Sequence, residues 1–272
     1  MSKIIKYPHI IREAKYGRVY EVAPDVYFPS VTTVLRYSTP TPEFLLKWQI
    51  EKSNGDYNRH LNHSGEASEI GTAVHSLIER LLAGEEITIT DNPKDFVPGK
   101  GYYPTYETTT AIRKGLQSFL AFWDHCNPKI ESTEQLLFSI EKDKDEYLYP
   151  FCGRCDIVAV INGERWMLDV KTSKYAKGVF NYKCQLSMYR LLHDAMFPDK
   201  PIDRMGVIWC KKDFLNANPP KSVLEPIEYE YKPELIHHLY TIFREVYDGY
   251  ALGYKPKTRA KAPKVFSLEG VK

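Results

Sequence analysis

The feature that most constrains the fold is the dipeptide Asn162-Gly163, which separates two apolar segments, residues 154–161 and 164–171. Asn-Gly between such segments is a strong hairpin signal, because both loop positions of a type I′ turn require positive φ. With a two-residue loop, counting back along both strands places Asp156 directly opposite Asp169. Opposed Cβ atoms lie roughly 5 Å apart, so two like charges there destabilise a sheet. A divalent cation between the two carboxylates would remove this conflict.

Lys171 follows Asp169 at i+2 and therefore projects from the same face of the strand. The residues after Asp156, IVAVI, are apolar without interruption, which is typical of a strand buried on both faces. An unpaired carboxylate would be costly there. The alternative is an exposed hairpin whose acids and lysines form salt bridges. The pattern favours a converging site, and carboxylates are natural ligands for Mg²⁺ or Mn²⁺.

Length and composition indicate an ordinary globular protein. The 272 residues suffice for one large α/β domain or for a core with a smaller appendage. No apolar run approaches the roughly 18 residues that span a bilayer, and the start does not resemble a signal peptide, so we expect a cytoplasmic protein without membrane contact. The five cysteines are an odd number in a sequence without a secretory signal, which predicts buried thiols rather than disulfides. The CxxC of Cys152 and Cys155 lacks a second pair at zinc spacing, so a structural zinc site is not expected.

The net charge of +2 gives no global basic field that would indicate nucleic acid. Basic residues are instead concentrated locally. Residues 255–264 (KPKTRAKAPK) contain five basic residues and no acid. This stretch is either a solvated tail or a segment that contacts phosphates beside a substrate channel.

The apolar periodicity predicts a helix-rich first half followed by a sheet. Short strands and turns are expected over residues 1–40, a polar loop over 55–65 and an insertion or loop over 85–106. Helices are expected over 42–54, 66–83, 107–126, 180–195 and 233–252, and strands over 133–140, 148–161, 166–170, 205–210 and 227–231. The expected fold is therefore α/β (mixed α+β), with a central mixed sheet that carries the β-hairpin and is flanked by helices.

This order of elements predicts three parts. Residues 1–65 would form an accessory region of strands and a helix. Residues 66–232 would form the core, with an insertion near 85–106. Residues 233–272 would form a closing helix and a basic tail.

Four further polar residues are candidates for the same site. His75 flanks the apolar stripe of its helix and would be either a boundary residue or a metal ligand. Glu134 lies in line with an apolar strand face, so it is either a solvated strand end or a carboxylate with a cationic partner. Gln185 and Tyr189 are one helical turn apart, as in an ordinary amphipathic helix or as a polar pair that holds the lysine or a phosphate.

Taken together, the motifs GTAVH, STEQ, GRCD, LDVKTSK and QLSMY, in that order, resemble the PD-(D/E)XK nuclease superfamily. Within it they resemble the RecB-type and lambda-exonuclease-like branch. The resemblance covers about residues 70–195 and implies a restriction-endonuclease-like core. A lone D-x-K is a weak signal, whereas the ordered set is quite specific.

The resemblance implies a metal centre. His75, Asp156 and Asp169 would be ligands of Mg²⁺ or Mn²⁺, with the carbonyl of Val170 joining them. Glu134 would be a helper acid that coordinates through water or supports a second metal. Relatives with an iron–sulfur cluster carry three cysteines near the C-terminus. The last cysteine here is Cys210, so no iron–sulfur cluster is expected.

The resemblance also implies the remaining roles. Lys171 would be the catalytic lysine, and Gln185 and Tyr189 would form the motif on the core helix. Further supporting or substrate-binding residues in the matching motifs would be Arg154, Thr172 and Lys174. Asp169 stands where many family members have Glu.

The function that these residues imply is a Mg²⁺- or Mn²⁺-dependent DNA nuclease that leaves 5′-phosphate ends. Exonuclease action on linear DNA ends, in recombination, repair or phage DNA processing, is the first expectation. A structure-specific or restriction-like endonuclease is one alternative, and a non-catalytic nucleic-acid-binding module with the same fold is another. Partners could include a second copy of the chain or a single-strand-annealing recombination protein.

Overall fold

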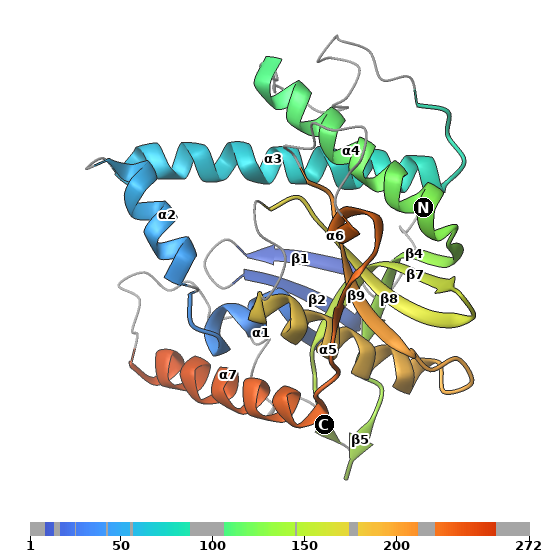
Figure 1. Ribbon diagram of the computed structural model, residues 1–272. Coiled ribbons are helices and arrows are strands. Elements are labelled where there is room, and N and C mark those ends of the chain that lie inside the picture. The colour runs from blue at the N-terminus through green and yellow to red at the C-terminus, as the bar shows by residue number, and fades with distance from the viewer. Residues whose placement is uncertain are drawn as a thin grey trace, which may run out of the picture.

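The computed structural model describes residues 9–13, 17–24, 26–41, 43–54, 57–87, 106–144, 146–173, 179–211 and 221–253 (Figure 1). The strands are β1 (His9–Glu13), β2 (Gly17–Ala23), β3 (Val26–Pro29), β4 (Lys129–Phe138), β5 (Lys142–Asp143), β6 (Glu146–Tyr147), β7 (Cys152–Ile161), β8 (Glu164–Lys171), β9 (Arg204–Trp209) and β10 (Ile227–Tyr229). The helices are α1 (Val31–Ser38), α2 (Glu43–Ser53), α3 (Tyr57–Leu82), α4 (Tyr106–Cys126), α5 (Phe180–Met196), α6 (Lys221–Leu224) and α7 (Pro233–Gly253).

A five-stranded mixed sheet forms the centre, in the order β10-β9-β8-β7-β4. The pair β8–β9 is parallel, and the other neighbours are antiparallel. The parallel pair is connected through α5, as a parallel connection requires a crossover. A separate three-stranded sheet, β1-β2-β3, precedes α1 and touches the central sheet through a bridge between Ser30 and Cys152.

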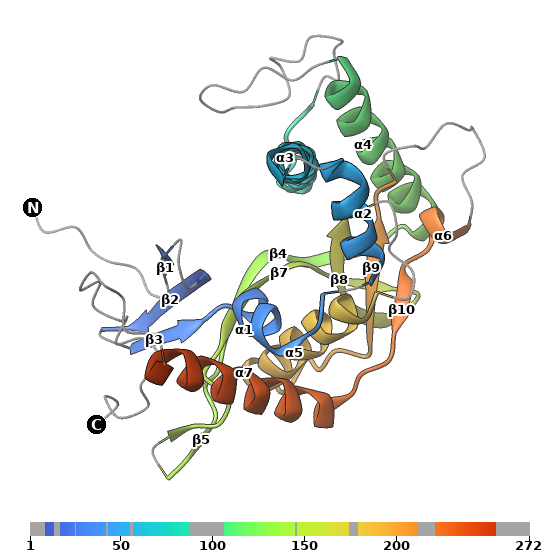
Figure 2. The ribbon, with the colours of Figure 1, turned by 90° about the vertical axis from the view of Figure 1, so that its left-hand side faces the viewer.

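Helices cover both faces of the central sheet (Figure 2). On one face, α3 and α4 pack against apolar side chains of β7, β8 and β9. On the other face, α1, α5 and α7 enclose a second core with alternate residues of the same strands. The central strands are therefore buried on both sides, which explains their nearly continuous apolar sequences. Within the described residues, no helix is long and apolar enough to cross a membrane.

The predicted mixed α/β fold is confirmed, and so is the hairpin that anchors it. Asn162 and Gly163 both have positive φ, at 53° and 86°, and β7 pairs with β8 from Ile161–Glu164 to Ile157–Leu168. The predicted helices on either side of the sheet are also present, with ends that differ by a few residues. The insertion expected near 85–106 and the basic stretch 255–264 lie largely or wholly outside the described residues.

Two predictions about the first half are wrong. Residues 31–38 were expected to be extended, but they form α1, because the Ser30 side chain caps the helix by accepting the Thr33 N–H at 3.0 Å. Residues 57–65 were expected to be a loop, but they belong to α3, which is 26 residues long. Helix growth is cooperative, so an established helix continues through polar residues. The predicted boundary at residue 65 therefore lies inside a helix.

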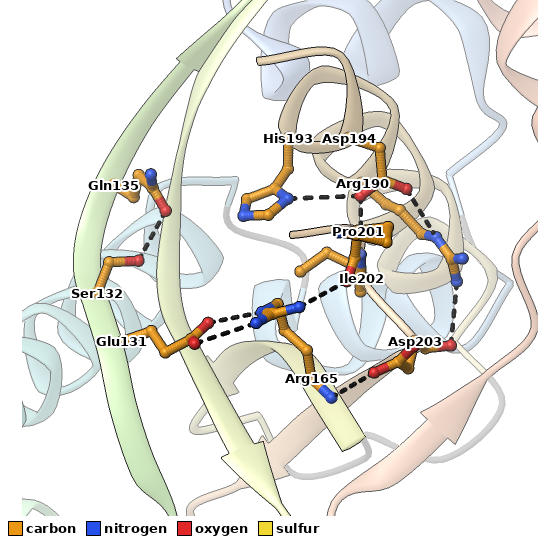
Figure 3. Close-up of polar contacts among 10 residues, drawn as sticks. All are labelled: Glu131, Ser132, Gln135, Arg165, Arg190, His193, Asp194, Pro201, Ile202 and Asp203. Atoms are coloured by element: carbon orange, nitrogen blue, oxygen red, sulfur yellow. Dashed lines mark hydrogen bonds and ion pairs between the residues drawn. The ribbon is translucent and has the colours of Figure 1, made fainter. Parts of the chain in front are cut away.

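Polar contacts connect β4, β8 and the end of α5 at one end of the central sheet (Figure 3). The pairing of β4 with β7 is irregular between Ile130 and Ser132, so Glu131 has no counterpart across the ladder. The Glu131 carboxylate accepts two bonds from Arg165 of β8, at 2.6 and 3.1 Å. The backbone N–H of Arg165 donates in turn to Asp203 at 2.7 Å. The irregularity is thus fixed by a bidentate ion pair.

We predict that Glu131→Gln destabilises the protein by about 1 kcal/mol, or roughly 2–4 °C, because the neutral amide cannot accept both charge-assisted bonds from Arg165. Thermal unfolding at neutral pH measures the change. The matched control is Glu43→Gln, whose partner Lys47 lies on the surface of α2 and whose loss should leave the midpoint unchanged. Equal midpoints for all three proteins would contradict the assignment.

Candidate metal centre and active site

The site begins where the β7–β8 ladder ends. The last hydrogen-bonded pair is Ile157–Leu168, so Asp156 and Asp169 stand where the next pair would come. The backbone N–H of Val170 instead donates to Asp156 Oδ2 at 2.7 Å. A side-chain carboxylate has therefore replaced a strand carbonyl as the acceptor, and this holds the Asp156 side chain at the end of the sheet.

Helix α3 brings His75 to this carboxylate. The residues that bury α3 against the sheet, among them Val74, Leu77 and Ile78, recur at helical spacing. His75 lies beside this apolar stripe, and its Nδ1 is 3.5 Å from Asp156 Oδ2. The histidine that the sequence predicts to flank the apolar stripe thus lies beside Asp156, the first of the two predicted aspartates.

Strand β4 contributes Glu134. It lies opposite Asp156, because its neighbours Thr133 and Gln135 pair with Ile157 and Cys155. Its φ of 49° is left-handed, a conformation that costs a non-glycine residue about 1–3 kcal/mol and that concentrates at functional sites. Arg154 Nη1 lies 3.4 Å from the Glu134 carboxylate.

Three side chains could share one cation. One ligand atom from each of His75, Glu134 and Asp156 lies within 4.8 Å of the others. Together with Glu79, Thr133 and other residues they line one pocket. An imidazole and two carboxylates are a suitable donor set for a divalent metal such as Mn²⁺ or Mg²⁺. The residues present therefore fit the predicted metal.

Burial and neighbouring charges disfavour the ionised form of both carboxylates in this group. Burial, and then the charge of Asp169, raise the pKa of Asp156 to about 7. Burial, and then the charge of Asp156, raise the pKa of Glu134. Burial lowers the pKa of His75, which keeps the imidazole neutral and able to coordinate at neutral pH. A bound cation would favour the ionised form of both carboxylates.

A second cluster adjoins the first on β8. Asp169 is buried and forms an ion pair with Lys171. Its other oxygen accepts a hydrogen bond from Gln185 Nε2 at 2.9 Å, and the same nitrogen lies 3.3 Å from the hydroxyl of Tyr189. Burial alone would lower the pKa of Lys171, but the charges of Asp169 and Asp156 outweigh it and raise the pKa. Lys171 is therefore positively charged at neutral pH.

The structure thus divides the predicted site residues into two adjacent groups. His75, Glu134 and Asp156 face one another, whereas the Asp169 carboxylate contacts Lys171 and Gln185. Of the remaining predicted residues, Val170 lines the pocket and Arg154 lies beside Glu134. Thr172 is buried next to Gly71 of α3. Lys174 lies outside the described residues.

Sequence reasoning assigned no role in the site to two residues of this region. Glu79 follows His75 by one helical turn and lines the same pocket. Tyr182 precedes Gln185 by three residues, and the Lys171 ammonium lies 5.1 Å from the centre of its ring. Helical spacing from His75 and from Gln185 was the available signal in both cases.

Gly153 leaves space for Tyr189. A Cβ at position 153 would lie 2.3 Å from Tyr189 Cε1. We predict that Gly153→Ala destabilises the protein by about 1–3 kcal/mol, since the buried ring must move. Chemical denaturation measures this loss. In Gly65→Ala, the control, the new Cβ meets nothing within 4 Å and stability should be kept or increased. A fully stable Gly153→Ala would contradict the close approach.

We predict that Asp156→Asn stabilises the metal-free protein at pH 8 by about 1–3 kcal/mol. The folded state holds the Asp156 proton up to about pH 7, whereas the unfolded chain releases it near pH 4. The wild type therefore loses stability as pH rises from about 4 to 7, and the amide removes this loss.

Denaturation of both proteins in a chelator at pH 5 and pH 8 provides the measurement. The advantage of the variant should be greater at pH 8 than at pH 5. A variant that is less stable than the wild type at pH 8 would show that the carboxylates do not repel one another in the folded protein.

One of the comparisons with known proteins identifies a family. No curated protein matches the chain by sequence. Among solved structures, the crystal structure of SSO0001 is similar at 18% identity and a TM-score of 0.29, over 61% of this chain and 66% of that one, just under two thirds. A TM-score this low does not show a shared fold. A family model does match residues 45–261, most of the chain, and by this match the protein belongs to the PD-(D/E)XK nuclease superfamily.

Proposed function

We propose that this protein is a Mg²⁺- or Mn²⁺-dependent DNA exonuclease that hydrolyses phosphodiester bonds and leaves 5′-phosphate ends. Members of the superfamily typically use a divalent metal, and family membership implies a nucleic-acid substrate. The observation that carries the proposal is the position of the His75, Glu134 and Asp156 group directly beside the Asp169–Lys171 pair. A metal centre and a charged lysine are then available to one phosphate.

In this proposal His75, Glu134 and Asp156 hold the cation, and Asp169 and the Val170 carbonyl join them. When bound, the cation would polarise the scissile phosphate and increase the acidity of the attacking water. The remaining chemistry belongs to the side chains. Lys171 would orient the water or neutralise negative charge that develops on the phosphate in the transition state.

Gln185 and Tyr189 would keep the Asp169–Lys171 pair in place. Gln185 donates to Asp169 and contacts the Tyr189 hydroxyl. Burial, and then the charges of Asp169 and Asp156, raise the pKa of Tyr189 well above its ordinary value, so its hydroxyl stays protonated. Arg154, which lies beside Glu134, would contact a substrate phosphate. Thr172 and Lys174, which follow Lys171 in the sequence, would do the same.

The choice of exonuclease rests on the ordered motifs, which resemble the RecB-type and lambda-exonuclease-like branch. GTAVH supplies His75, and QLSMY supplies Gln185 and Tyr189. The helical N-terminal half would wall a channel for a DNA end, and the basic stretch 255–264, which lies outside the described residues, would add charge that attracts phosphates. Recombination, repair or phage DNA processing is the proposed setting, with a second copy or an annealing protein as partner.

The test is cleavage of end-labelled linear duplex and single-stranded DNA, with covalently closed circles alongside, in Mg²⁺ and in Mn²⁺. Linear DNA should be shortened to products with 5′-phosphates, and circles should stay intact. Asp156→Ala and Lys171→Ala should each reduce the rate by about 10²- to 10⁴-fold. Asp143→Ala on the β5–β6 hairpin and Lys232→Ala before α7, both exposed, are the matched controls and should cleave normally.

Each other outcome has a definite meaning. Cut circles would replace the exonuclease by a structure-specific or restriction-like endonuclease. DNA binding without cleavage in either metal would leave a non-catalytic binding module. Cleavage that survives both active-site substitutions would overturn the residue assignment.

A further inference from the structure

Helix α5 presents a third side chain to the catalytic strand. Tyr182, Gln185 and Tyr189 are spaced i, i+3 and i+7 and so lie on one helical face. Gln185 contacts Asp169, and Tyr182 faces Lys171, two residues further along β8. The face of α5 that holds the Asp169–Lys171 pair therefore extends one turn toward the start of the helix.

Two hydrogen bonds converge beside the Tyr182 ring. The Tyr182 hydroxyl donates to Ser173 Oγ at 3.0 Å. The carbonyl of the same serine accepts the indole N–H of Trp209 at 2.8 Å. Trp209 is the residue that pairs with Lys171 across the parallel β8–β9 ladder. The Tyr182 hydroxyl is thus bonded to the segment that directly follows Lys171 on β8, and Ser173 connects it to Trp209 of β9.

The ammonium of Lys171 contacts two groups of different kinds. It forms the ion pair with Asp169, and its Nζ is 5.1 Å from the centre of the Tyr182 ring. The negative face of an aromatic ring attracts a cation, and more strongly where water is excluded. The Lys171 side chain is only 21% exposed, so the ring acts in a largely desolvated environment.

We propose, on the basis of the proposed function, that Tyr182 is a positioning residue that holds the Lys171 ammonium through the face of its ring. A bound cation would compete with Lys171 for the Asp169 carboxylate. The ring would then be the contact that still holds the ammonium in place. The ring, rather than the hydroxyl, is therefore the functional part of the side chain.

The kinetic test compares three variants under conditions in which the wild type cleaves DNA. Tyr182→Leu should lower kcat by about 3- to 30-fold, as expected for a lost cation–π contact, with KM for DNA unchanged. Tyr182→Phe keeps the ring and should retain most of kcat. Tyr240→Leu removes a ring from the aromatic cluster of Tyr149, Phe151 and Phe243; it should lower the melting temperature without lowering kcat.

A double-mutant comparison assigns the effect to Lys171. In the weakly active Lys171→Gln background, adding Tyr182→Leu should cause no further loss of kcat. An equal loss of kcat in Tyr182→Phe and Tyr182→Leu would overturn the proposal, because the hydroxyl would then carry the effect. A further loss in the Lys171→Gln background would also overturn it, because the ring would then act on another group.

A second measurement does not depend on activity. In protein labelled with ¹³C at the lysine ε-carbons, ring currents should displace the Lys171 resonance upfield in the wild type and in Tyr182→Phe, but not in Tyr182→Leu. The resonance is assigned by its absence from Lys171→Ala. An undisplaced wild-type signal would overturn the contact even if the enzyme is active. A displaced signal in a protein that cleaves no DNA would keep the contact and reject the nuclease.

Discussion

The repulsion between carboxylates at the end of the β7–β8 hairpin is the constraint on which the rest of the site depends. Asp156 and Asp169 come from neighbouring strands, and Glu134 lies across from Asp156 on a third. Burial, and then the charge of Asp169, raise the pKa of Asp156 to about 7. A sequence selected only for stability would avoid such an arrangement. Its presence at the end of a well-packed sheet fits a group of side chains that could share a cation.

The surrounding structure compensates this repulsion with specific partners. Lys171 and Gln185 contact Asp169, the Val170 N–H contacts Asp156, and Arg154 contacts Glu134. Each partner comes from the strand that carries the acid, from a neighbouring strand or from α5. The site is therefore preorganised by secondary structure rather than by loops, which is how catalytic groups are held within small tolerances. These partners also explain why the His75, Glu134 and Asp156 group and the Asp169–Lys171 pair lie side by side as separate clusters.

Much of this could be predicted from the sequence, because strong local rules applied. The Asn162-Gly163 turn set the hairpin register, and the register set the relation between the two aspartates. The predictions that were wrong, and the features that were not predicted, depend on contacts in the folded protein. Ser30 starts a helix in a segment of β-branched residues that reads as a strand. The left-handed backbone of Glu134 depends on neighbours that no spacing rule identifies, whereas helical spacing from Gln185 was the available signal for Tyr182.

The three side chains that could share a cation are divided between two structural layers. Glu134 and Asp156 belong to the sheet, whereas His75 belongs to α3, which precedes the sheet in the chain and packs onto it through an apolar stripe. The complete ligand set therefore exists only after α3 has docked. A partly folded chain with its sheet formed and α3 detached would lack one ligand. Assembly of the site would in this way act as a checkpoint, so that the protein gains its complete ligand set only in its fully folded form.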